Sequence, residues 1–182
     1  FRDYARLPTA ELKPLQLNAL VNDVLALYAS EPHDSVARAQ VITELDAACP
    51  AILGDEQQLR QVIHNLLQNA QDACEARGQG LATARVRVRT EWRAQRQRVR
   101  LTVTDTGPGF APNILQRAFE PYVTTKAKGT GLGLAVVKKI ADEHGARIDM
   151  ANVQEGGDIQ GAQVSLSFAV AQTAQGLEQP PS

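Results

Sequence analysis

The chain has 182 residues, of which 43% are hydrophobic, so it holds enough apolar material for the core of one domain. Aromatic residues make up only 4%, and Val, Leu, Ile and Ala must therefore fill that core. The 19 Lys and Arg residues nearly balance the 20 Asp and Glu residues, and this argues against bulk electrostatic binding of nucleic acid. Cys49 and Cys74 lack the spacing of a zinc site or a disulfide scaffold and fit a reducing compartment.

Three regions are expected along the chain. Residues 1–14 contain two prolines and are predicted to be the end of a preceding element and a linker. Residues 15–170 are predicted to form one folded domain, and 171–182 a disordered tail. No apolar run reaches the roughly 20 residues that a membrane span needs, and no signal peptide opens the chain. The start at Phe1 rather than at a methionine indicates a piece of a longer protein.

Apolar residues at helical spacing predict a helix over 17–30. Residues 39–45 are a candidate strand. The segment 50–54 is short and apolar, and its secondary structure is ambiguous. The strongest helical pattern runs over about 56–76. Asp55 is its expected N-cap, and Gln58 stands in the capping-box position.

That helix is expected to end at Gly78 and Gly80. Strands are then predicted over about 83–92 and 98–104, joined as a hairpin around 93–97.

Residues 105–133 are rich in Gly and Pro and far longer than an ordinary loop, which favours a functional lid. A helix is predicted from near Gly131 to Gly145, and final strands over 147–151 and 162–170. This order of elements predicts an α+β two-layer sandwich, in which helices cover one face of a mixed sheet.

A narrow polar stripe follows the apolar face of the helix predicted over 56–76. Asn65, Asn69 and Asp72 stand at i, i+4 and i+7 along one edge of the apolar residues, where they are half-buried and need partners. One interpretation is a polar rim with ordinary hydrogen bonds. The other is that the amide oxygens reach a hydrated Mg²⁺, which prefers oxygen ligands and keeps several waters and phosphates.

A carboxylate is expected on the core side where the second hairpin strand ends. Leu101 and Val103 share one face, and Asp105 continues it by parity, followed by Gly107 and Gly109. A buried carboxylate needs a donor, and the exocyclic amine of a bound base would supply one. The alternative is that Asp105 closes its own turn. The two glycines allow the backbone to approach a ligand closely.

A glycine-rich segment opens the next predicted helix. Gly129, Gly131 and Gly133 weaken a helix start but expose backbone N–H groups to a phosphate at the positive end of the helix dipole. The spacing is neither a Walker A loop nor a dinucleotide fingerprint. Lys126 and Lys128 precede it, and either could reach a phosphate or remain a solvated loop charge.

Together these motifs resemble the ATP-binding domain of histidine kinases and the wider GHKL ATPases, with the Bergerat fold and a long ATP lid, over about residues 15–170. The resemblance implies that Asn69 binds Mg²⁺, that Asn65 is a phosphate-side or base-side neighbour, and that Asp105 takes the adenine amino group. It places Gln163 or Ser165 near the base pocket. The residues that it assigns to ATP are Asn65, Asn69, Asp72, Asp105, Gly107, Gly109, Phe119, Thr125, Lys126, Gly129, Thr130, Gly131, Leu132, Gly133 and Leu134.

Asn65 and Asn69 are the residues to which the resemblance gives a catalytic role. Gyrase-type relatives have a Glu in the position of Asn65, as the base that activates water. An Asn cannot take up a proton at ordinary pH, which favours transfer to an incoming imidazole over hydrolysis.

Residues 1–8 are similar to the end of the second dimerisation helix of nitrogen-regulation sensor kinases of the NtrY/NtrB type. This implies transfer of the ATP γ-phosphate to a histidine on a dimerisation domain that precedes Phe1, and relay to a response regulator. His33, His64 and His144 are expected on the surface or in packing contacts. The full protein would be a homodimer and this piece compatible with a monomer.

The resemblance implies a cytoplasmic domain, in a protein that is anchored in the inner membrane if of NtrY type and soluble if of NtrB type. The rival functions are a serine kinase of the same fold and a binding module switched by nucleotide. No nucleic acid partner is expected.

The predicted hairpin is rich in arginine. Residues 77–100 hold eight arginines and one acid, Glu91, and several of the arginines alternate with apolar residues. One interpretation is a strand face in solvent. The other is a docking surface for an acidic partner, on a response regulator or another kinase domain.

Overall fold

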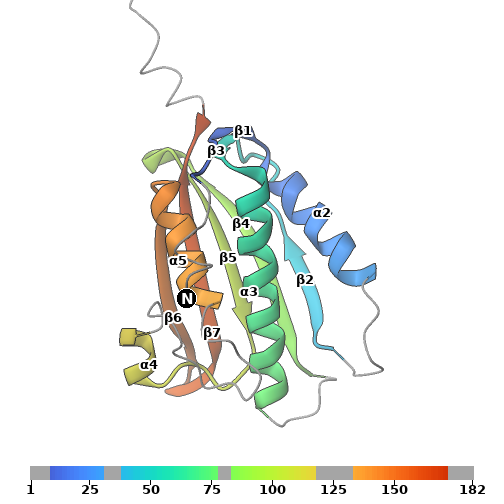
Figure 1. Ribbon diagram of the computed structural model, residues 1–182. Helices are drawn as coiled ribbons and strands as arrows, with labels where there is room; N and C mark the ends of the chain where they lie inside the picture. The colour runs from blue at the N-terminus through green and yellow to red at the C-terminus, as the bar shows by residue number, and fades with distance from the viewer. Residues whose placement is uncertain (1–8, 31–37, 78–82, 118–132, 172–182) are drawn as a thin grey trace, which may run out of the picture.

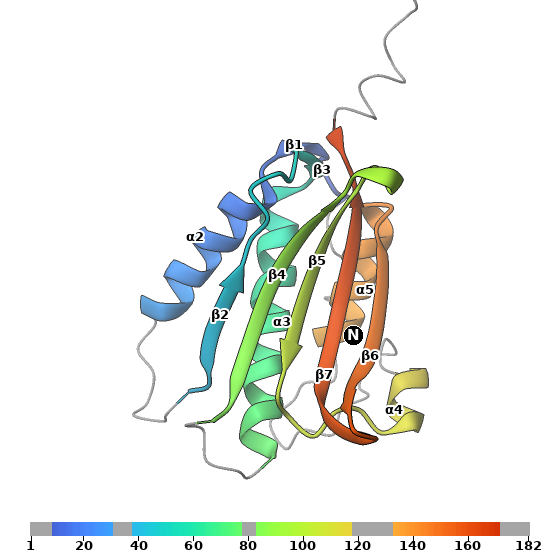
Figure 2. The same ribbon diagram turned by 180° about the vertical axis from the view of Figure 1, so that it is seen from behind.

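The computed structural model describes residues 9–30, 38–77, 83–117 and 133–171. A mixed five-stranded sheet forms one layer, and three helices lie across one of its faces (Figures 1 and 2). The sheet strands in spatial order are β2 (Gln40–Glu44), β4 (Arg85–Arg93), β5 (Arg98–Asp105), β7 (Asp158–Ala169) and β6 (Arg147–Glu155). The covering helices are α2 (Leu17–Ser30), α3 (Glu56–Ala76) and α5 (Gly133–Glu143). Only β2 and β4 are parallel, so the predicted two-layer α+β sandwich with a mixed sheet is confirmed.

Helix α3 forms where the sequence predicts it, because its apolar stripe is buried against the sheet. Asp55 is the N-cap, and its Oδ1 accepts the backbone N–H of Gln58 at 3.1 Å. The backbone N–H of Asp55, however, donates to Nε2 of His144 at 2.9 Å, so a histidine from the turn after α5 occupies the place that the capping-box prediction gives to the Gln58 side chain. Residues 78–82, where the helix is predicted to end, lie outside the described residues.

The two histidines in the described part of the chain both pack against aromatic rings. His144 is buried, its Nδ1 lies 2.8 Å from the carbonyl oxygen of Ile140, and its ring meets Phe168 edge-on. Because Nε2 accepts a hydrogen bond, Nδ1 carries the ring proton. His64 is half-buried against Tyr28. The predicted packing role is confirmed for both, and His33 lies outside the described residues.

A second, two-stranded sheet is not predicted from the sequence. Strand β1 (Lys13–Leu15) pairs antiparallel with β3 (Ile52–Gly54), and the N–H of Glu11 donates to Oδ2 of Asp55 at 2.9 Å. The predicted linker therefore ends in a strand. The predicted tail also starts one residue too early, because Ala171 is buried and donates to the carbonyl of Ala51. The sequence does not predict β1 and β3 because three-residue strands are too short to show an alternation of apolar and polar side chains.

The other predicted elements are confirmed with changes at their ends. The hairpin of β4 and β5 turns through a short 3-10 helix, η1 (Ala94–Arg96). Strands β6 and β7 are longer than predicted and meet at a turn in which Gly156 and Gly157 have φ of +61° and +87°. Helix α4 (Pro112–Arg117) lies inside the segment predicted as a lid. In the described part of the chain, no helix is long and apolar enough to cross a membrane.

The N-cap of α3 gives a pH-dependent prediction. Burial acts to raise the pKa of Asp55, but the N–H groups of Glu11, Gln58 and Gln57 outweigh it and hold the pKa below its usual value. The stabilisation is therefore complete above the pKa of unfolded Asp, about 3.9, and is lost as the pH falls through the lower folded value. We expect Asp55→Ala to lose about 1 kcal/mol at pH 7 and less at pH 3. Urea unfolding at both pH values measures this, and equal losses at the two would contradict it. Glu75→Gln, at the exposed far end of α3, is the control.

Candidate functional site

A cavity of about 500 Å³ opens between α3 and the sheet, at the end of β5. One wall comes from α3, the floor from β5 and β7, and the remaining walls from residues after β5 and from the start of α5. The cavity is mostly apolar, with Leu66, Val103, Phe110 and Val164 among its lining residues. A mostly apolar pocket with a few convergent polar groups is the usual form of a small-molecule site.

Asp105 is the buried carboxylate of this cavity. Its side chain is on the core face of β5, as parity predicts, and the residue is 9% exposed. Its Oδ1 accepts the backbone N–H of Gly107 at 2.8 Å, so the carboxylate also closes the turn that follows it. The two interpretations of Asp105 are therefore compatible, since closing the turn fixes the carboxylate at the cavity wall.

The glycines after Asp105 are required by close packing. A Cβ on Gly107 would lie 2.7 Å from the carbonyl carbon and oxygen of Ala73 on α3. Gly109 has φ of +82° and packs against Ile159 and Asn152. Gly109 lines the cavity, whereas Gly107 adjoins it and lets the loop rest directly on α3.

The polar stripe of α3 faces the same cavity in part. Asn69 and Asp72 are lining residues, whereas Asn65, one turn earlier, is half-buried and is not among them. A Cβ on Gly133 would lie 3.6 Å from the Asn69 amide, which places the first residue of α5 beside that amide. Leu134 completes this wall. The structure thus brings Asn69, Asp72, Asp105, Gly109 and Leu134 together around one cavity.

Several predicted residues are not brought to this site. Asp105 pairs with Ala162 and Val103 with Val164, and both β7 residues line the cavity. Gln163 and Ser165 alternate with them and point to the opposite face of the sheet, so their predicted place near the base pocket is wrong. The predicted residues outside the described part of the chain are Phe119, Thr125, Lys126, Lys128, Gly129, Thr130, Gly131 and Leu132.

Two polar residues that no sequence pattern marks hold the loop after β5 in place. Nη1 of Arg77, at the C-cap of α3, contacts the carbonyl oxygens of Thr106, Gly107 and Gln160 at 2.9, 3.1 and 3.2 Å. Asn152 on β6 accepts the N–H of Phe110 at 2.6 Å and donates to its carbonyl at 2.8 Å. Both act on backbone atoms of distant segments, which periodicity cannot reveal.

Arg77 gives a prediction for ligand affinity. Because one cationic group joins the loop after Asp105 to β7, we expect Arg77→Ala to weaken binding in the cavity about tenfold, in line with hydrogen bonds made by a charged group. Arg77→Lys should recover part of the loss, since an ammonium offers donors without the planar fork. Calorimetric titration with ATP measures this, with Arg60→Ala, on the exposed side of α3, as the control. An affinity equal to that of the control would contradict it.

Comparison with known proteins identifies the family. The family described as histidine kinase-, DNA gyrase B- and HSP90-like ATPase matches residues 54–172. The chain belongs to this ATPase family. An NtrY-like sensor histidine kinase of Rickettsia bellii is 34% identical over 165 residues, and the nitrogen regulation protein NtrY of Azorhizobium caulinodans is 32% identical over 175. These matches cover 86% and 92% of this chain but only 24% and 21% of the relatives, so the chain spans about a quarter of their length.

Solved structures of histidine kinases share the fold of this ATPase domain. The catalytic domain of the kinase ThkA superposes with a TM-score of 0.71 at 28% identity, over 87% of this chain and 95% of that one. Full-length ShkA in complex with AMPPNP has a TM-score of 0.71 at 30% identity, over 92% of this chain and 34% of that one. ThkA in complex with the response regulator protein TrrA has a TM-score of 0.70 at 25% identity, over 92% and 44%. The fold is therefore that of the catalytic domain of sensor histidine kinases.

Proposed function

We propose that the cavity binds ATP with Mg²⁺ and that the domain transfers the γ-phosphate to a histidine of a dimerisation domain. The observation that carries this proposal is that Asp105 and Asn69 lie on walls of one apolar cavity of about 500 Å³. Its apolar lining suits an aromatic base, and the carboxylate of Asp105 would accept the hydrogen bonds of an exocyclic amino group.

The residues of α3 and α5 would face the phosphates. The amide oxygen of Asn69 suits a Mg²⁺ that keeps waters and phosphate oxygens as its other ligands, and bound Mg²⁺ would neutralise charge developing on the phosphates. Gly133 stands beside Asn69 at the start of α5, where backbone N–H groups favour an anion. Asn65 adds no base, so the domain would act by positioning ATP for an incoming imidazole.

The partners proposed for the longer protein follow from its relatives. NtrY-like sensor kinases are among the relatives of this chain, and ThkA, a kinase of similar structure, has been crystallised with a response regulator. We infer that the phosphate passes to a response regulator, and that the whole kinase is a homodimer whose catalytic domains lie in the cytoplasm while an inner-membrane anchor holds the protein.

One transfer experiment tests the proposal. This domain is incubated with radiolabelled ATP, Mg²⁺ and the dimerisation domain of an NtrY-like kinase, and the label is tested for stability in acid and base. We expect an acid-labile, base-stable phosphohistidine on the partner. Binding of ATP without such a label would contradict the kinase assignment. An acid-stable label on serine would favour a serine kinase, and altered partner contact without transfer would favour a nucleotide-switched binding module.

A further inference from the structure

The second face of the sheet is not covered by any element that the structure describes. Helices α2, α3 and α5 all lie on the other face (Figures 1 and 2). Alternate residues of the strands point outward here, and their cross-strand partners place them in rows. We call this surface the basic face. Its charged residues are Arg85, Arg87, Arg89, Arg93, Arg98, Arg100, Arg147, Glu44, Glu91, Asp149, Glu155 and Asp158.

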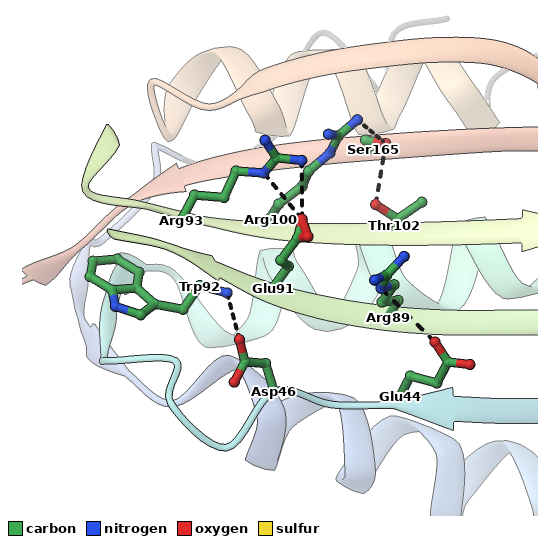
Figure 3. Close-up of polar contacts among 9 residues, drawn as sticks. All are labelled: Glu44, Asp46, Arg89, Glu91, Trp92, Arg93, Arg100, Thr102 and Ser165. Atoms are coloured by element: carbon green, nitrogen blue, oxygen red, sulfur yellow. Dashed lines mark hydrogen bonds and ion pairs between the residues drawn. The ribbon is translucent and has the colours of Figure 1, made fainter. Parts of the chain in front are cut away.

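Seven guanidinium groups on the basic face stand against five carboxylates, but the charges are unevenly placed. Six of the guanidinium groups and only one of the carboxylates, Glu91, lie on β4 and β5, so positive charge is in excess there. Glu44 is shared by Arg87, at 3.3 Å, and Arg89, at 3.9 Å. Figure 3 shows that Glu91 turns toward Arg93, whose Nη2 lies 3.1 Å away. The side chains of Arg87 and Arg89 remain 53% and 57% exposed, so their charge is available to a partner.

Serine hydroxyls orient two further arginines without neutralising them. Arg98 donates to Oγ of Ser167 at 2.9 Å and to its carbonyl at 2.7 Å. Arg100 donates to Oγ of Ser165 at 3.1 Å, and that hydroxyl also contacts Thr102 (Figure 3). These guanidinium groups are held in defined positions along the sheet, which lowers the entropy lost when they bind carboxylates.

The arrangement brings like charges together. Arg93 and Arg98 are direct cross-strand partners, and Arg85, Arg87 and Arg89 follow one another at two-residue spacing on β4. Like charges opposite one another destabilise a sheet. Carboxylates from a second molecule would relieve that repulsion. A face that only contacted solvent would gain nothing from placing like charges side by side.

The chemistry of the face selects the kind of partner. In the described part of the chain, the exposed large apolar residues are Leu12, Leu27 and Ile159, and none lies on the basic face. A permanent interface has an apolar core, whereas a polar and charged face suits a short-lived encounter guided by charge. Glu44, Glu91 and Asp149 would repel a uniform polyanion such as a lipid surface, and a protein surface can match both signs.

We infer that the basic face is an initial docking surface for the response regulator, which would meet it with an acidic surface. This inference rests on the proposed function, in which a regulator must arrive and leave at each phosphate transfer. Charge complementarity would raise the rate of encounter and would weaken as salt screens it.

The test is charge reversal on β4 in the full-length kinase. With Arg85→Glu, Arg87→Glu and Arg89→Glu combined, we expect the KM for the regulator in phosphotransfer to rise at least tenfold and to depend less steeply on salt. The affinity for ATP and the amount of phosphohistidine should not change, because the cavity is on the other face of the sheet. The matched control reverses three charges in the helical layer, Arg60→Glu, Lys138→Glu and Lys139→Glu.

A milder triple variant, with Gln at the same three positions, guards against misfolding and should raise the KM by a smaller factor. An unchanged KM in a folded variant would overturn the docking surface. So would loss of binding to phosphatidylserine vesicles with the KM unaltered, because the occupant would then be a membrane. Absence of phosphohistidine in the wild-type kinase would instead count against the proposed function, so the two failures are distinguishable.

Discussion

Asp105→Asn is expected to weaken ATP binding by a factor of about 10 to 100 while the domain stays folded. This factor corresponds to the 1.5–3 kcal/mol typical of a hydrogen bond to a charged group. An Asn at this position keeps an oxygen that can accept the N–H of Gly107, so the turn after β5 can still close. It loses the negative charge and places an amide N–H₂ where the amino group of the base would donate.

Calorimetric titration with ATP and thermal unfolding together measure this prediction. Asp149→Asn removes the same charge from an exposed position of β6 on the opposite face and should leave the affinity unchanged. Asp105→Ala removes both the charge and the turn acceptor, and should therefore also lower stability. If the affinity of the Asn variant equalled that of the wild type, Asp105 would not belong to the binding site.

The largest effect on stability is expected from Gly161→Ala. A Cβ at Gly161 would overlap the backbone carbonyl oxygen of Asp105 on the neighbouring strand. Backbone atoms cannot move aside as a flexible side chain can, so β7 would have to separate from β5 at the cavity floor. We expect a loss of about 3 kcal/mol, or a fall in Tm of roughly 6 to 12 °C for a domain of this size.

Gly133→Ala is the matched control for that substitution. Its nearest contacts are the atoms of the Asn69 amide at 3.6 Å, an ordinary van der Waals distance, and it stands at the start of a helix. Alanine should be tolerated there without loss of stability, because it has the higher helix propensity. Scanning calorimetry of both variants checks the contrast, and equal melting temperatures would show that the overlap at Gly161 is relieved by local movement.

Local patterns in the sequence were enough to predict the helical layer and part of the cavity. The buried stripe and N-cap of α3, and the inward side chain of Asp105, follow from periods of 3.6 and 2 residues. The grouping of Asn69 with Asp105 followed only from the combination of motifs, since neither residue indicates the other. The resemblance to histidine kinases was therefore needed to place them in one site.

Long-range contacts account for what could not be predicted. Arg77 and Asn152 contact backbone atoms of segments far away in the sequence, and β1 exists only because β3 is beside it. The family resemblance places Ser165 near the base pocket, but Ser165 follows Val164 on β7 and therefore points to the basic face, away from the cavity. Alternation along β7, counted from a residue known to be buried, is the signal that could have excluded it.

Asp55 connects three parts of the chain through hydrogen bonds. Its carboxylate accepts the N–H of Glu11, its own N–H donates to His144 directly after α5, and it caps the helix that carries Asn69. A force on the segment before β1 would therefore be transmitted through Asp55 to α3 and α5, the two helices that flank the cavity. It would reach them without being transmitted through the five-stranded sheet. Such a force would act at the Asp55 end of these two helices, and a bound nucleotide would act at their cavity end.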